Sequence, residues 1–220
     1  MDKNNTNSSG ITNGRPFHVH DEQAAKRERI LAAALKLFAH EPYQAVTMDR
    51  VAVAAGVAKG TLYLYFPSKD ALYLGVLSDG LDTAYRTYQA SADPKLPVVE
   101  RMRRSIAVMV EFYDQRRDFL QFYATEEPRL SEARNRIIEG SRERAFNFFA
   151  SLIEEGIRVG VFTRVDPRLA TFTIQGAIRS VLLYYGPSRP VSEISRELGN
   201  LMLRSLGADP VQVSKPVHPQ

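Results

Sequence analysis

Residues 59–69 bring together lysines, hydroxyl-bearing side chains and a glycine, with no acidic residue among them. Lysine neutralises phosphate groups, hydroxyl groups bond to phosphates and base edges, and a glycine lets a nucleic-acid backbone approach the peptide. We therefore take this stretch as a candidate DNA-binding surface. Its exposed face would carry Lys59, Thr61, Tyr63 and Tyr65, and the DNA backbone could approach the peptide at Gly60. Arg50, in the preceding segment, could point the same way.

Two short helices joined by a sharp turn would position these side chains. The first is predicted from Met48 to Ala55 with Thr47 as its N-cap, and the second from Lys59 to Phe66. Gly56 lies at the junction, where a positive φ costs little only for glycine. Two short helices crossing closely in this way form a helix-turn-helix, whose second helix enters the major groove of DNA. An ordinary helical hairpin with a solvated basic face is the alternative.

The run GVAKGTLYLYFPSKDAL at residues 56–72 resembles the signature of the TetR family of bacterial transcription regulators. The resemblance covers residues 25–75. It implies that Thr47, Lys59, Tyr63, Tyr65 and Lys69 touch DNA phosphates, and that Gly60 and Thr61 lie against the DNA. The chain departs from the family at Ala58, where a serine or threonine usually caps the second helix, and at Glu41-Pro42, where the family often has a helix-ending glycine.

Composition limits the alternatives. The chain has 220 residues, 44% of them hydrophobic and 25% charged, with a formal net charge of +4, which is ordinary for a soluble globular protein. It has no cysteine, which excludes disulfides, cysteine metal sites and cysteine nucleophiles. We expect a cytoplasmic protein without a membrane span or signal peptide, and neither a cofactor, a metal site nor a catalytic site, because the few histidines have no apparent partners.

Helical periodicity continues to the end of the chain without paired strands, so the fold class is all-α. We expect an N-terminal three-helix DNA-binding domain with the helix-turn-helix at residues 23–70, and a C-terminal helical ligand-binding and dimerisation domain at residues 71–208. Loose tails would occupy residues 1–22 and 209–220. A long helix capped by Ser68 would join the two domains, so a tilt of that helix would move the second helix of the helix-turn-helix.

The C-terminal domain has more apolar surface than one small bundle can bury. The last two helices, Pro167 to Tyr185 and Val191 to Leu206, would pack against their copies in a homodimer. Aromatic residues with a few polar anchors would form a pocket for a small hydrophobic or aromatic effector, although aromatic residues at helical spacing usually belong to the core. The candidates are Phe112, Phe119, Phe122, Tyr123, Phe149, Phe172, Gln175 and Arg179.

The sequence thus predicts a ligand-responsive regulator, in the family's common mode a repressor, that binds a palindromic operator in double-stranded DNA as a dimer. The alternative is a DNA-bound dimer whose C-terminal domain docks a protein partner instead of a small molecule. A small helical enzyme would require a cluster of titratable groups in a cavity, and the sequence indicates none.

Overall fold

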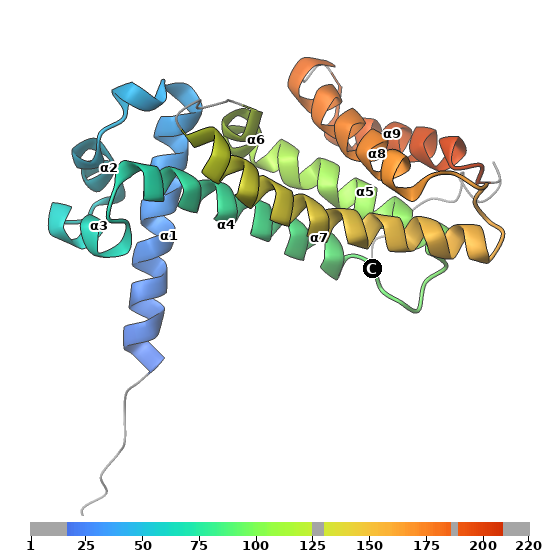
Figure 1. Ribbon diagram of the computed structural model, residues 1–220, viewed down its shortest axis with the longest axis horizontal. Coiled ribbons are helices and arrows are strands. Elements are labelled where there is room, and N and C mark those ends of the chain that lie inside the picture. The colour runs from blue at the N-terminus through green and yellow to red at the C-terminus, as the bar shows by residue number, and fades with distance from the viewer. Residues whose placement is uncertain (1–16, 125–129, 186–188, 209–220) are drawn as a thin grey trace, which may run out of the picture.

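The computed structural model describes residues 17–124, 130–185 and 189–208, and this part of the chain is helical without strands. The elements in chain order are α1 Phe17–His40, η1 Tyr43–Ala45, α2 Met48–Ala55, α3 Lys59–Tyr65, α4 Lys69–Ala90, α5 Val98–Gln115, α6 Arg117–Ala124, α7 Ser131–Arg158, α8 Pro167–Ser180, η3 Val181–Tyr185 and α9 Val191–Ser205. Figure 1 shows α2 and α3 at one end of the molecule and α8 and α9 toward the other. Within the described ranges, no helix is long and apolar enough to cross a membrane.

The first helix is longer than predicted. It begins at Phe17 rather than at Gln23, so residues 17–22 belong to α1 and not to the predicted tail. Residues 1–16 and 209–220, predicted as loose tails, lie outside the described residues. The short 3-10 turn η1, which follows Pro42, was not predicted from the sequence.

Several predicted caps are present. The Thr47 hydroxyl accepts a hydrogen bond from the backbone N–H of Arg50, at 3.3 Å, and the Ser68 hydroxyl accepts one from the N–H of Ala71, at 3.1 Å. The Asp166 carboxylate accepts bonds from the first turn of α8, which starts with a proline. These bonds satisfy backbone donors that have no partner inside the helix, and so fix where each helix begins.

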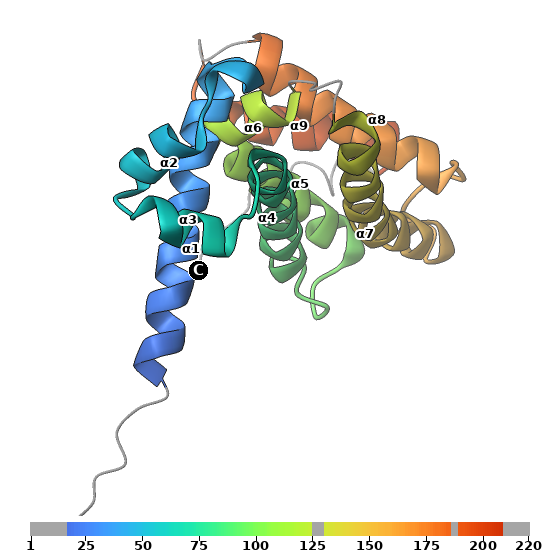
Figure 2. The ribbon, with the colours of Figure 1, turned by 60° about the vertical axis from the view of Figure 1, so that its left-hand side comes forward.

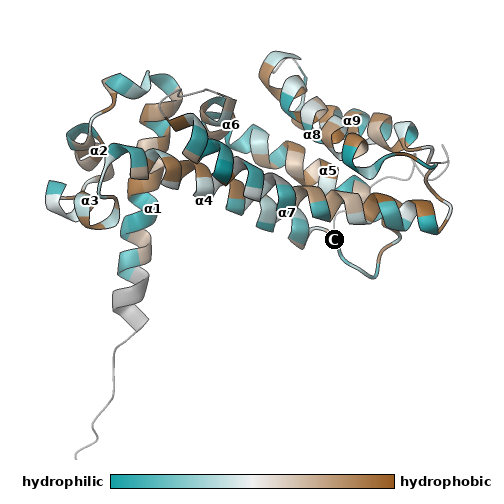
Figure 3. Ribbon diagram, in the orientation of Figure 1, coloured by the Kyte–Doolittle hydropathy of each residue, from teal (hydrophilic) through white to brown (hydrophobic). Residues whose placement is uncertain are grey.

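The α4 helix connects the two halves of the molecule. It packs on α1, α5 and α7, which Figure 2 shows from a second side. Figure 3 shows hydrophilic and hydrophobic residues along both α4 and α7, as expected for helices with one buried face. One continuous cluster of buried side chains extends from α1 to α9, so the DNA-binding half is not an isolated module.

Candidate DNA-binding interface and effector cavity

The turn between α2 and α3 has the predicted geometry. Gly56 has φ 64° and ψ 40°, a left-handed conformation that glycine adopts without a Cβ penalty. The N–H of Val57 bonds to the carbonyl of Ala52 at 3.0 Å, which ends α2 tightly. Val51 and Leu62 are fully buried between the helices. The helix-turn-helix is therefore confirmed as a local structure.

The exposed face of α3 differs from the predicted one. Tyr63 and Leu64 are 42% and 86% exposed, and Lys59 and Gly60 are also exposed. Thr61, in contrast, is half-buried. The sequence prediction took alternate residues, which share one face of a strand and not of a helix. Positions three and four apart share a helical face, so Gly60 lies with Tyr63 and Leu64. This arithmetic would have identified Leu64, which the prediction missed.

Tyr65 is turned toward α1 rather than outward. It is half-buried, and its hydroxyl donates a hydrogen bond to the backbone carbonyl of Gln23 at 3.2 Å. The expectation that it lies on the exposed face is therefore corrected. A contact between its hydroxyl and a phosphate, which the resemblance implies, stays a prediction.

The start of α3 combines an uncapped helix end with a paired lysine. Ala58 has the extended backbone of an N-cap, but its side chain makes no capping hydrogen bond. The Lys59 ammonium group lies 2.7 Å from a carboxylate oxygen of Asp49 in α2. This hydrogen bond raises the pKa of Lys59, so the lysine is charged at neutral pH. Both side chains are more than half exposed, so a phosphate can compete for the ammonium group.

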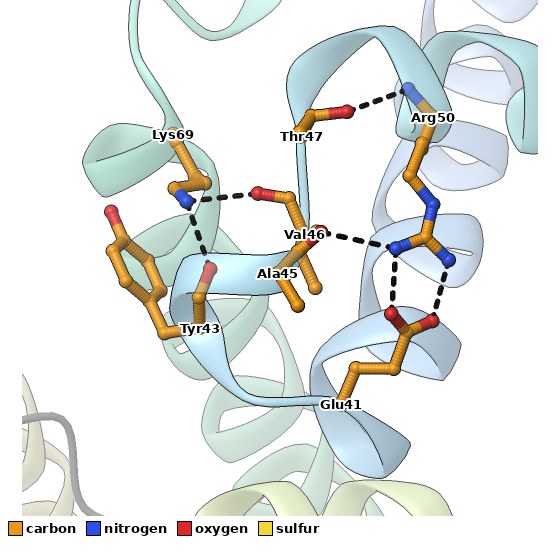
Figure 4. A network of polar contacts seen from close by, with 7 residues as sticks. All are labelled: Glu41, Tyr43, Ala45, Val46, Thr47, Arg50 and Lys69. Atoms are coloured by element: carbon orange, nitrogen blue, oxygen red, sulfur yellow. Dashed lines mark hydrogen bonds and ion pairs between the residues drawn. The ribbon is translucent and has the colours of Figure 1, made fainter.

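Arg50 is held by the loop before α2. Its two terminal nitrogens donate to both carboxylate oxygens of Glu41, at 2.6 and 2.7 Å, and one of them also donates to the carbonyl of Ala45 at 3.0 Å (Figure 4). The paired hydrogen bonds lower the pKa of Glu41. These contacts direct the guanidinium toward the loop and not toward α3, which the sequence prediction did not anticipate.

Lys69, at the start of α4, fixes the same loop from the other side. Its ammonium group donates to the carbonyls of Tyr43 and Val46, both at 2.8 Å, and lies 4.3 Å from the centroid of the Tyr43 ring (Figure 4). The Tyr43 hydroxyl in turn donates to Asp70. Arg50 and Lys69 therefore have structural partners in the free protein. Their predicted contacts with DNA stay predictions.

Half of the predicted effector residues meet in one cavity. It has a volume of about 170 Å³ and lies between α5, α6 and α8. The side-chain nitrogen of Gln175 is buried and has no hydrogen-bond partner among the described residues. The Arg179 guanidinium lies 5.9 Å from the centroid of the Tyr123 ring, and burial raises the pKa of the neighbouring Tyr113. The lining residues are Met109, Tyr113, Tyr123, Phe172, Gln175, Gly176 and Arg179.

The other predicted effector residues lie elsewhere. Phe122 and Phe149 are packed in the core, at 1% and 0% exposure, and do not line this cavity, so core packing accounts for both. Phe112 and Phe119 line a separate cleft beside α1. The sequence alone could not assign these aromatic residues to the cavity, the core or the cleft, because the assignment depends on which helices pack together.

Large apolar side chains are exposed on the last helices. A buried position would be expected for residues of this size, yet they are 49–81% exposed. They are Leu169, Phe172, Tyr184, Tyr185 and Leu201. This is the surface that the sequence predicts to be covered by a second copy of the chain.

Comparison with known proteins agrees with this geometry. Residues 30–76 match the family described as bacterial regulatory proteins, tetR family, and residues 95–206 match the tetracyclin repressor-like C-terminal domain. The two matches cover both halves of the molecule, and the second spans more than half of the chain.

Two relatives and one solved structure match most of the chain. The chain is 28% identical over 149 residues to the uncharacterized HTH-type transcriptional regulator YhgD of Bacillus subtilis, covering 68% of this chain and 78% of that protein. It is 26% identical over 173 residues to the HTH-type transcriptional repressor KstR2 of Mycolicibacterium smegmatis, covering 78% and 84%. The structure of the fatty acid degradation regulator FadR from Bacillus halodurans shares the fold, with a TM-score of 0.73 at 22% identity over 84% of this chain and 97% of that one. With a helix-turn-helix at one end and the matched helical domain behind it, the chain belongs to the TetR family of bacterial DNA-binding transcription regulators.

Proposed function

We propose that the protein is a homodimeric repressor that acts in the cytoplasm, binds a palindromic operator through α3 of each subunit and is released by a small effector. The observation that carries the DNA-binding part is the outward face of α3, where Lys59, Tyr63 and Leu64 are exposed together. Cations and hydroxyl groups bind phosphates, and an exposed aliphatic side chain fits a thymine methyl group in the major groove.

Dimerisation follows from the exposed apolar side chains of α8, η3 and α9. A seven-residue recognition helix contacts few base pairs, and two copies related by a twofold axis read two half-sites. Leu201 is 59% exposed in α9, so Leu201→Asp should shift the protein toward monomer in sedimentation velocity. Val159→Asp is the matched control, because Val159 is similarly exposed, at 55%, outside this surface. An unchanged dimer in Leu201→Asp would place the interface elsewhere.

The cavity between α5, α6 and α8 supports the effector part of the proposal. A buried donor without a partner, such as the Gln175 amide, costs roughly 1–3 kcal/mol, and an acceptor on a ligand would remove that cost. At about 170 Å³ the cavity is smaller than the roughly 300–1,000 Å³ of most drug-sized sites. We therefore expect a compact, largely apolar or aromatic effector with a hydrogen-bond acceptor. Binding to a state that is incompetent for DNA would lower operator occupancy.

The decisive experiment is fluorescence anisotropy of the purified protein with the DNA that flanks its own gene, across a salt series. We expect selective binding with a steep salt dependence. In the Lys59→Ala/Tyr63→Ala double variant, affinity should fall, and the salt slope should decrease by about one unit per subunit for the lost lysine contact. Thermal stability should hardly change, because both side chains are exposed.

An exposed arginine in α7 provides the control for this variant. Among the described residues Arg136 pairs with Glu132 of its own helix, so Arg136→Ala removes a positive charge without touching α3. If Arg136→Ala weakens DNA binding as much as the double variant does, net charge and not α3 determines the affinity. The same assay then screens aromatic and aliphatic acids and esters for release of the DNA.

A further inference from the structure

A second, larger cleft lies at the joint between the two halves of the molecule. Its volume is about 600 Å³, which is within the range of small-molecule sites. One wall is α1, the other walls are α4 and the end of α5, and Phe119 of α6 closes it. Figure 2 shows α1 beside α4, with α6 above them. This cleft shares no lining residue with the proposed effector cavity.

Two arginines of this cleft have no acidic partner in the described part of the chain. Arg86 donates a hydrogen bond only to the hydroxyl of Thr83, at 3.2 Å, and the Arg116 guanidinium lies 4.4 Å from the centroid of the Phe112 ring. A third arginine, Arg27, is already paired with Asp79 at 3.1 Å. Since neither guanidinium pairs with a carboxylate among the described residues, Arg86 and Arg116 are available to an external anion.

The charge of the cleft is mixed but favours an anion. Three guanidinium groups and two carboxylates line it, and one of those carboxylates, Asp79, is engaged by Arg27. The remaining one, Glu28, is exposed and also lines the cleft, so three guanidinium groups minus two carboxylates leave the lining with a net charge of +1. Between the charged groups the cleft is apolar, with Leu35, Phe112 and Phe119 among its lining residues. This is a surface for a molecule with an anionic head and an apolar body.

We propose that this cleft binds an amphipathic organic anion, a carboxylate or phosphate monoester on an apolar body, with Arg86 and Arg116 supplying the positive charge. The Arg27–Asp79 ion pair joins α1 to α4 at the same place. An occupant therefore contacts both α1, which packs on the helix-turn-helix, and α4, which connects the two halves of the molecule. Its binding is coupled to the angle between them, and by linkage to DNA affinity.

The test is isothermal titration calorimetry of the full chain without DNA, using octanoate, octyl phosphate and octanol below micellar concentrations. We expect one or both anions to bind and octanol to bind at least about tenfold more weakly. The tighter of the two anions identifies the preferred head group. In Arg86→Gln/Arg116→Gln the affinity for the anion should fall by at least about tenfold, because charge-assisted hydrogen bonds are lost.

A steric variant tests the site without changing its charge. Ala32 is exposed and lines the cleft, so Ala32→Trp should block binding. Ala25→Trp, on the same helix but outside the cleft, is the matched control, and both introduce the first tryptophan into the chain. Saturating anion should change the affinity for DNA in the parent and not in Ala32→Trp.

Three results would overturn the site. The first is that neither anion binds. The second is that binding survives both Ala32→Trp and the double arginine variant. The third is that Arg179→Gln, in the other cavity, removes binding while the cleft variants do not. An anion that binds in the cleft but leaves DNA affinity unchanged would overturn the coupling. Because the titration contains no DNA, the three results that concern the site are distinct from a failure of the proposed DNA binding, whereas the coupling rests on that proposed function.

Discussion

Replacing Gly80 with alanine should destabilise the protein, although alanine normally strengthens a helix. Gly80 lies in α4 under the ring of Phe119, and an added Cβ would lie 2.0, 2.4 and 2.5 Å from three ring atoms. Phe119 is 1% exposed. The rings of Tyr113, Phe122 and Tyr123 surround it, with centroids 6.5, 6.4 and 6.2 Å away. These three rings restrict the movement of the Phe119 ring.

The expected magnitude is a balance of two effects. Overpacking a core costs about 1–3 kcal/mol, and approaches this short place Gly80→Ala at the upper end. Exchanging glycine for alanine in a helix gains about 1 kcal/mol. The net loss is about 2 kcal/mol, which lowers the melting temperature by roughly 4–8 °C for a chain of this size.

A second glycine isolates the helix effect. Gly140 lies in α7, is exposed, and an added Cβ there would have no atom within 4 Å. Gly140→Ala should therefore raise the free energy of unfolding by about 1 kcal/mol. Circular dichroism melts at one fixed protein concentration compare the two, since dimerisation makes the melting temperature depend on concentration. A Gly80→Ala protein as stable as the parent, or shifted like Gly140→Ala, would refute the packing argument.

Two further substitutions test the local structure of α3. Ala58→Ser should raise the free energy of unfolding by about 1 kcal/mol, because the backbone at this N-cap is already extended and only the capping oxygen is missing. Urea denaturation measures this free energy, and a neutral or destabilising result would place the cap elsewhere. Leu64→Ala should reduce the preference for operator over random DNA while leaving thermal stability and the salt slope unchanged, because Leu64 is 86% exposed and uncharged. Competition anisotropy measures this preference, and unchanged selectivity would exclude a base contact by Leu64.

The local elements were predictable because their signals are local. Met48–Ala55 has the predicted bounds, and α3 ends one residue before the predicted Phe66. A capping hydroxyl, a glycine with positive φ and a proline after a capping aspartate each act within one turn of the helix. The exposed face of α3 was wrong at Thr61 and Tyr65 for a different reason. The prediction counted alternate residues, whereas the helical period leaves Thr61 and Tyr65 partly buried, with Tyr65 turned toward α1.

The roles of charged side chains were less predictable. Arg50 and Lys69 read in sequence as cations near a DNA-binding surface. In the structure Arg50 donates hydrogen bonds to Glu41, and Lys69 donates to carbonyl groups of an irregular loop. No periodic sequence pattern specifies the shape of this loop. A loop without regular hydrogen bonds needs such partners, because buried carbonyl groups are costly when unpaired. The division of the aromatic residues into core and cavities likewise depends on contacts between distant helices.

An aromatic cluster connects α6 to α1, α4 and η1. Phe38 of α1 lies 5.1 Å from the ring of Tyr73 in α4, and Tyr73 lies 4.8 Å from Phe122 in α6. Tyr43 joins the cluster from η1, 5.4 Å from Tyr73. Interiors packed at this density transmit displacement and do not absorb it. We therefore expect a shift of α6 at the proposed effector cavity to displace α1 and η1, and the Lys69 contacts to the carbonyls of Tyr43 and Val46 to carry that displacement to the start of α2.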